Sequence, residues 1–289
     1  MTHLLTALRP SHWAKNLLVL APVLFSRQLT SPSVLKTAFS AFALFCAVSS
    51  ASYLINDLSD IERDRMHPLK RLRPIAAGKL GKTAALSTAL VLLVFGLAGA
   101  AAINRSFGLV LGCYCLVNLA YTFILKQLVI LDIFAVALGF VLRAVAGAVV
   151  IGVEISSWLL ICTTLLALFL GFSKRRYELL LLREDAGTHR EVLDEYNPHF
   201  LDMMIAIVTA ATVTSYALYT ASEETLQRFH TRGLLLTLPF VLYGIFRYLY
   251  LIYQKDRGGD PVETALTDPA TLINLVLWGV TVAVILYWR

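Results

Sequence analysis

Three aspartates lie close together in the stretch NDLSDIERD, at residues 57, 60 and 64. On a helix with 3.6 residues per turn, this spacing places Asp57, Asp60 and Asp64 within about 60° of one face. Carboxylates so close repel one another unless a cation lies among them. Hard oxygen ligands suit Mg²⁺, which keeps several waters and completes its shell with substrate phosphates. The spacing therefore predicts a magnesium site that receives a diphosphate.

A cluster of cations follows the aspartates directly, and includes Lys70, Arg71 and Arg73. Basic side chains beside a metal-bound diphosphate would neutralise the negative phosphate charge that the metal ion does not. The alternative is a solvated helix end, at which the acids pair locally with Arg63, Arg65 and Lys70. We favour the metal interpretation because the stretch comes directly after a long apolar run, so that it lies at the mouth of a membrane helix.

The elements that must position these side chains are predicted to be membrane helices. The chain has 289 residues, of which 58% are hydrophobic and 15% charged, and its mean hydropathy is +0.71. Apolar stretches of about 20 residues, enough to cross a bilayer, recur along the whole chain. We therefore predict an all-α membrane protein in which residues 1–289 form one domain. The nine predicted spans are 15–30, 34–56, 84–103, 106–124, 129–150, 157–173, 201–220, 233–253 and 271–288.

The cations are distributed unequally between the two sides of these spans. The N-terminus and the loops after the second, fourth, sixth and eighth spans carry 17 of the 25 Lys and Arg residues, and the other side carries six. Lys and Arg are enriched in cytoplasmic loops. This predicts a cytoplasmic N-terminus and cytoplasmic aspartate loop, with the C-terminus outside the cell.

The motif Asn56-Asp57-x-x-Asp60-x-x-x-Asp64, at the end of the second of nine spans, resembles the signature of the UbiA superfamily of intramembrane prenyltransferases. The resemblance covers nearly the whole chain. It implies a nine-helix bundle around a lipid-accessible cavity in the plasma (inner) membrane, where Asn56 and the three aspartates hold a diphosphate through Mg²⁺.

One feature departs from the usual members of that superfamily. The resemblance leads us to expect a second aspartate motif, D-x-x-x-D, in the loop after the sixth helix, but the matching segment reads GFSKRRYELLLLRED. Lys174, Arg175 and Arg176 stand where carboxylates are expected. A cationic cluster attracts a bare phosphate directly, so we predict that these three residues bind a phosphate. The alternative is positive-inside anchoring of a helix end.

Four segments, RPSHWAKN, KRLRPIAAGK, GFSKRRYELL and EYNPHFLDMM, are similar to one branch of the superfamily, the decaprenyl-phosphate phosphoribosyltransferases. This resemblance implies transfer of 5-phosphoribosyl from phosphoribosyl diphosphate to a polyprenyl monophosphate, with release of diphosphate. Lys15 would then neutralise a phosphate, as would Lys70, Arg71 and Arg73. Tyr121 and Lys126 either reach the same mouth or act as interfacial anchors.

Two other functions remain as alternatives. An aromatic prenyltransferase that uses a polyprenyl diphosphate would share the aspartates, but should also carry the second motif. A lipid transporter or scaffold would accommodate the intramembrane Arg143 and Arg247, yet it has no need of three metal-spaced carboxylates. We expect no nucleic-acid partner, and the sequence is compatible with a homo-oligomer.

Overall fold

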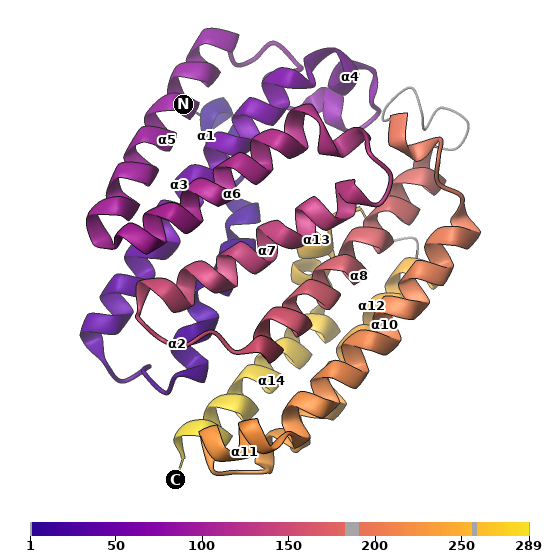
Figure 1. Ribbon diagram of the computed structural model, residues 1–289. Coiled ribbons are helices and arrows are strands. Elements are labelled where there is room, and N and C mark those ends of the chain that lie inside the picture. Colours follow the sequence, from indigo (N-terminus) through magenta and orange to yellow (C-terminus); the bar gives the residue numbers. More distant parts are fainter. Residues whose placement is uncertain (1, 183–190, 256–258, 289) are drawn as a thin grey trace.

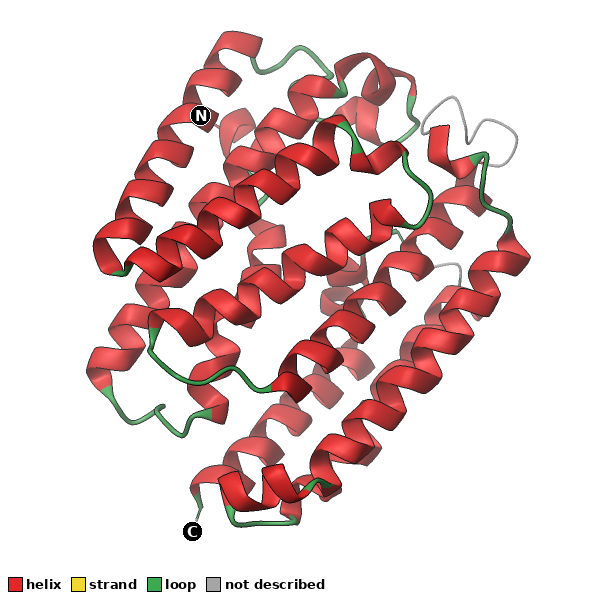
Figure 2. Ribbon diagram, in the orientation of Figure 1, coloured by secondary structure: helices red, strands yellow, loops and turns green. Residues whose placement is uncertain are grey.

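The fold is all α-helical, as predicted. The computed structural model describes residues 2–182, 191–255 and 259–288, and these contain no strand (Figure 2). Eight helices in this part of the chain are long and apolar enough to cross a membrane, and one of them, α12, is counted with the 3₁₀ turn η6 (Gly233–Thr237) that precedes it. The eight are α3 (Pro32–Ser59), α5 (Lys82–Ile103), α6 (Arg105–Phe123), α7 (Leu131–Val150), α8 (Ser157–Leu182), α10 (Pro198–Ala221), α12 (Leu238–Gln254) and α14 (Pro269–Tyr287).

These helices match the second to ninth predicted spans, but the count of nine is not confirmed. The first predicted span, 15–30, consists of the 3₁₀ helix η1 (Pro10–Leu20) and the short helix α2 (Ala21–Phe25), which follow α1 (Thr2–Ala7). A 3₁₀ helix of eleven residues is unusually long. Pro22 is the second residue of α2 and has no N–H to continue a regular helical ladder. The segment therefore enters the bundle as a broken element.

The two ends of the bundle differ in what they carry. One end, here called the α4 end, carries the connections after α3, α6, α8 and α12, because successive long helices alternate in direction. The opposite end, called the α11 end, carries α11 (Glu223–Phe229) and the last turn of α14, and Figure 1 shows α4 and α11 at opposite ends. The short elements at the α4 end are α4 (Ile61–Met66), η2 (Lys70–Leu72), η3 (Leu125–Gln127), η5 (Glu191–Leu193) and α13 (Pro261–Thr267).

Helix α7 lies between the two main hydrophobic clusters. Its Ala146 packs in the cluster of Phe45 on α3 and Leu111 on α6. Its Ile133 packs in the second cluster, which also contains Phe169 on α8. Because α7 contacts both halves of the bundle, a polar side chain on α7 can face an interior space between them.

Candidate active site

A polar cavity of about 230 Å³ opens at the α4 end of the bundle. Side chains from η1, α3, α6, α7 and α8 surround it, and cations outnumber acids among them. The charged and ring-bearing residues that line it are Arg9, His12, Lys15, Tyr53, Asp60, Arg63, Asp64, Lys70, Arg73, Tyr114, Tyr121, Lys126, Phe140, Arg143, Lys174 and Glu178. Such a cavity favours an anionic ligand that also carries a cation for the carboxylates.

The aspartates lie on either side of a bend between two helices. Helix α3 ends at Ser59, and α4 begins at Ile61. Asp60 lies at the bend, where its N–H donates to Asn56 O and its own carbonyl accepts from Asp64 N–H. The predicted continuous helix face is therefore broken at Asp60, and the three carboxylates reach the cavity region from two elements.

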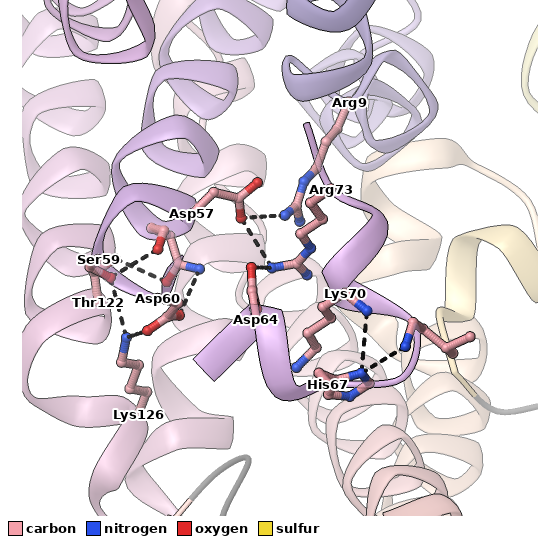
Figure 3. Close-up of polar contacts among 12 residues, drawn as sticks. Arg9, Asp57, Ser59, Asp60, Asp64, His67, Lys70, Arg73, Thr122 and Lys126 are labelled. Carbon is pink, nitrogen blue, oxygen red and sulfur yellow. Dashed lines mark hydrogen bonds and ion pairs between the residues drawn. The ribbon is translucent and has the colours of Figure 1, made fainter. Parts of the chain in front are cut away.

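Cations hold these carboxylates in place (Figure 3). Arg73 Nη1 donates to Asp57 Oδ1 at 3.1 Å and to Asp64 Oδ2 at 2.7 Å, so that one guanidinium joins two aspartates. Arg9 Nη2 donates to the same Asp57 oxygen at 2.5 Å. A shared cation offsets the repulsion between two neighbouring carboxylates.

The third aspartate has partners of its own. Lys126 Nζ donates to Asp60 Oδ1 at 2.5 Å, and Asn56 Nδ2 donates to Asp60 Oδ2 at 3.2 Å. Thr122 Oγ1 in turn donates to Asn56 Oδ1 at 3.4 Å. Lys126 and Asn56 thus reach the aspartate motif.

Burial affects the charge of the aspartates. It raises the pKa of Asp64 above its usual range, although Arg73 acts in the opposite direction. Asp57 is also buried, with 2% of its surface exposed. Carboxylates in this position gain from any cation that approaches them.

The donor atoms suit a hard divalent cation, since Asn56, Asp60 and Asp64 line the cavity and Asp57 is joined to Asp64 through Arg73. In the part of the chain that the structure describes, no three His, Cys, Asp or Glu residues are already placed to hold a metal ion. Arg73 and Lys126 instead occupy the acceptor oxygens. The oxygen donors of these residues suit a metal ion, and they would bind it when Arg73 and Lys126 pair with another anion.

The basic cluster Lys174 to Arg176 lies within α8, not in a loop, because this helix continues to Leu182. Only Lys174 lines the cavity. Arg176 points elsewhere, since its Nε donates to Asp202 Oδ1 at 2.5 Å and its guanidinium lies 4.2 Å from the Tyr253 ring centroid. Of the three cations that we predicted to bind a phosphate, the geometry of one helix therefore brings only Lys174 to the cavity.

Arg175 is buried in a network beside the cavity. Its Nε donates to Asp132 Oδ2 at 2.6 Å and its Nη1 to Glu178 Oε2 at 2.6 Å. Its Nη2 donates to the Tyr121 hydroxyl at 3.3 Å, and the Tyr196 hydroxyl donates to Asp132 Oδ1 at 3.0 Å. With two carboxylate partners, Arg175 is placed to orient Glu178 and Tyr121 and not to bind a phosphate itself.

Of the remaining predicted residues, Lys15 and Lys70 line the cavity, whereas Arg71 is exposed and does not. Lys15 Nζ lies 3.3 Å from Asp260 Oδ2, directly before α13. The predicted site residues that line the cavity are Lys15, Asn56, Asp60, Asp64, Lys70, Arg73, Tyr121, Lys126 and Lys174.

Arg9, His12 and Glu178 line the cavity, although no role was predicted for them. Arg9 and His12 belong to RPSHWAKN, and only Lys15 of that segment was singled out. Burial and the nearby Lys15 ammonium lower the pKa of His12 to about 3, so its ring is neutral near pH 7. Glu178 lies four residues after Lys174, and continuation of the helix past residue 173 would have placed both on one face.

Comparison with known proteins identifies the family of the chain. The model of the UbiA prenyltransferase family matches residues 17–263. The decaprenyl-phosphate phosphoribosyltransferase of Corynebacterium glutamicum is 35% identical over 98% of this chain and 86% of its own length. The enzyme of the same name from Mycobacterium tuberculosis is 33% identical over 96% of this chain and 91% of its own.

A solved structure shares the fold. The UbiA homologue from Archaeoglobus fulgidus, in a structure bound to GPP and Mg²⁺, superposes with a TM-score of 0.73 at 22% identity, over 98% of this chain and 99% of that one. With its eight long apolar helices, the protein is an integral, multi-pass membrane protein. The chain belongs to the UbiA prenyltransferase family.

Proposed function

We propose that the protein transfers the 5-phosphoribosyl group of phosphoribosyl diphosphate to a polyprenyl monophosphate of decaprenyl-like length and releases diphosphate. The observation that carries this proposal is the cavity in which Asp60 and Asp64 meet an excess of cations, Lys174 among them, with Asp57 joined to Asp64 through Arg73. The relatives at 33–35% identity, which are named for this transfer, support the same activity. Residues 1–289 would act as one catalytic domain.

In the proposed reaction, the bond from ribose C1 to the diphosphate oxygen breaks, and a bond from C1 to an oxygen of the lipid phosphate forms. A Mg²⁺ ion held by Asp57, Asp60 and Asp64, with Asn56 beside them, would stabilise the charge of the leaving diphosphate. The lipid phosphate is already an anion, so no side chain has to become a nucleophile.

The cations of the site would bind the phosphates of both substrates. Arg73 and Lys126 form ion pairs with the aspartates. When the aspartates turn to the metal, these cations are free to pair with the diphosphate oxygens, together with Lys70. Charge-assisted hydrogen bonds of this kind hold phosphate strongly, and they strengthen as charge moves onto the leaving group.

We further propose that the α4 end faces the cytoplasm and that the C-terminus lies outside the plasma (inner) membrane. The predominance of Lys and Arg on that side of the chain supports this orientation. It would give a water-soluble sugar diphosphate direct access to the cavity.

The direct test incubates purified protein with Mg²⁺, polyprenyl phosphate and phosphoribosyl diphosphate that is radiolabelled in the ribose. The proposal expects a labelled product that extracts with the lipid, and no such product in excess chelator. Absence of labelled lipid from folded, lipid-reconstituted protein would contradict the proposal. If polyprenyl diphosphate and an aromatic acid gave a prenylated product instead, the protein would be an aromatic prenyltransferase.

A further inference from the structure

Arg143 lies deep in the bundle, at the floor of the polar cavity. It is twelve residues along α7 from Leu131, which corresponds to about 18 Å at the helical rise of 1.5 Å per residue. Only 5% of its surface is exposed, yet it lines the cavity. A charge at this depth is costly to bury, and such residues usually face a cavity or a partner.

The partners of Arg143 are all neutral. Its Nε donates to Asn16 Oδ1, its Nη1 to Gly139 O and its Nη2 to the Tyr114 hydroxyl, each at 2.8 Å. These three acceptors come from η1, α7 and α6, so they fix the plane of the guanidinium without cancelling its charge. Each terminal nitrogen carries two N–H groups, and each uses one of them in these contacts.

The other intramembrane arginines have acidic partners. Arg175 pairs with Asp132 at 2.6 Å, and Arg247 pairs with Asp268 at 2.7 Å. Among the described residues, no carboxylate forms an ion pair with Arg143. The protein therefore keeps one oriented, uncompensated cation at the floor of its polar cavity, and an anionic ligand would compensate it.

The position of Arg143 indicates which anion would bind. Towards the α11 end lies an apolar cavity of about 360 Å³, whose walls include Leu18 on η1 and Ala148 on α7. Arg143 precedes Ala148 by five residues, and Lys15 on η1 precedes Leu18 by three. Along both elements, a cation that lines the polar cavity is thus followed within five residues by a wall residue of the apolar cavity, which marks a boundary between charged and apolar surroundings. A phosphate esterified to a hydrocarbon chain has its charge at the same kind of boundary.

We propose that Arg143 binds the phosphate monoester of the polyprenyl phosphate at the floor of the cavity, with Lys15 as a second cation. This inference rests on the proposed function and adds a binding residue to it. In the proposed function the aspartates would hold the leaving diphosphate at the mouth, and Arg143 lies at the other, deep end of the cavity. A lipid phosphate on Arg143 would therefore attack C1 from the face opposite to the diphosphate.

The test measures binding without turnover, by offering farnesyl phosphate, farnesol and phosphoribosyl diphosphate one at a time in the presence of Mg²⁺. We expect the wild-type protein to bind farnesyl phosphate more tightly than farnesol. Arg143→Gln should weaken farnesyl phosphate binding roughly tenfold to a hundredfold, the loss of a charge-assisted hydrogen bond, and leave the affinity for phosphoribosyl diphosphate unchanged. Arg143→Lys should lose less, because it keeps the charge but not the planar fork.

Arg247→Lys provides the matched control, since it alters an intramembrane arginine outside the cavity and should change neither affinity. If Arg143→Gln does not fold, Arg143→Lys carries the test. Unchanged farnesyl phosphate binding, or equal losses for both substrates, would overturn the proposal and leave Arg143 a packing residue. A selective loss for phosphoribosyl diphosphate would also overturn it and assign the site to the 5-phosphate.

The turnover assay separates this inference from the proposed function. If the wild-type protein makes labelled lipid and Arg143→Lys has an unchanged KM for the lipid phosphate, only the inference fails. If the wild-type protein makes no labelled lipid, the proposed function fails, whatever the binding measurements show.

Discussion

Arg73 lies between two of the aspartates to which we assign metal binding. Its guanidinium contacts Asp57 and Asp64, and Arg9 also reaches Asp57. These pairs offset the repulsion of the carboxylates without a metal ion. They also place the cations proposed to bind phosphate next to the proposed metal ligands. When a metal-bound diphosphate binds, the carboxylates would pair with the metal and the cations with the phosphate oxygens. The same residues can thus stabilise the free protein and bind the substrate.

The role of the aspartates as metal ligands can be tested with an adjacent acid as the control. Asp60→Ala should reduce kcat by about two orders of magnitude or more, since a metal contributes several kcal/mol of charge stabilisation. Glu62→Ala should leave turnover unchanged, because the Glu62 side chain is 77% exposed and pairs only with Arg65 at the surface in the described contacts. Initial rates in matched vesicles check both variants. Full turnover in Asp60→Ala would rule out the assigned role.

Asp64 should make stability depend on pH. Burial raises the pKa of Asp64 in the folded protein, so the folded state favours the protonated carboxyl. The resulting gain in folding stability is fully present when the pH is below the ordinary pKa of an aspartate. That contribution is lost as the pH rises through the raised value. Asparagine cannot ionise, so Asp64→Asn should unfold at a higher temperature than the wild type at pH 7, and the difference should shrink as the pH falls. Thermal unfolding in detergent from pH 7 to pH 4 measures this difference, and a difference that grows towards low pH would contradict the account.

At the scale of elements, α8 separates three consecutive cations. Neighbouring residues on a helix point in different directions, so Lys174 faces the cavity, Arg175 the network of Asp132 and Glu178, and Arg176 the side of α10 and α12. The three adjacent cations thus have three different surroundings, so mutations of the three residues should have different effects.

Arg175→Met should destabilise the fold by about 3–5 kcal/mol, because it leaves the fully buried Asp132 without its cation. Arg176→Ala should be close to neutral in stability and in both KM values, since its partner Asp202 is 37% exposed. Denaturant unfolding and substrate titrations of the two variants compare these effects. A large rise of either KM in Arg176→Ala, with its fold intact, would return Arg176 to the phosphate site.

The long helices were predictable because hydropathy over about 20 residues decides whether a segment crosses a bilayer. Pro22 already marks the first span as interrupted, but the contacts of the buried Asn16 with Ser49 on α3 and Arg143 on α7 were not predictable, because these residues lie far apart in sequence. The aspartate motif and Lys126 were identified from local spacing and position. The pairing of the aspartates with Arg9 and Arg73 depends on how η1 and η2 pack against α3, which local spacing does not encode.

At the scale of the whole molecule, the bundle has one polar end and an apolar interior behind it. The polar cavity opens at the α4 end, and the apolar cavity lies towards the α11 end. This arrangement suits a reaction between a soluble sugar diphosphate and a lipid, provided that the α4 end faces the cytoplasm. The orientation of the molecule is therefore part of the functional account.

Thiol labelling in intact cells tests this orientation, in a variant whose four native cysteines are replaced. Arg71→Cys, exposed at the α4 end, should react with an impermeant reagent only after the membrane is opened, whereas Gln227→Cys on α11 should react in intact cells. A cysteine near residue 187 would serve as well but lies outside the described residues. The reverse labelling pattern would place the cavity mouth outside the cell.

The central claim is the transfer of phosphoribosyl to a lipid phosphate, and two labelled forms of phosphoribosyl diphosphate test it most directly. One form carries ³²P in the 5-phosphate and the other in the terminal phosphate of the diphosphate, and each is incubated with the purified protein, Mg²⁺ and polyprenyl phosphate. The account predicts that the 5-phosphate label moves into the lipid while the diphosphate label is released into water, in equal amounts. Diphosphate label in the lipid, or neither label there with folded protein, would contradict it.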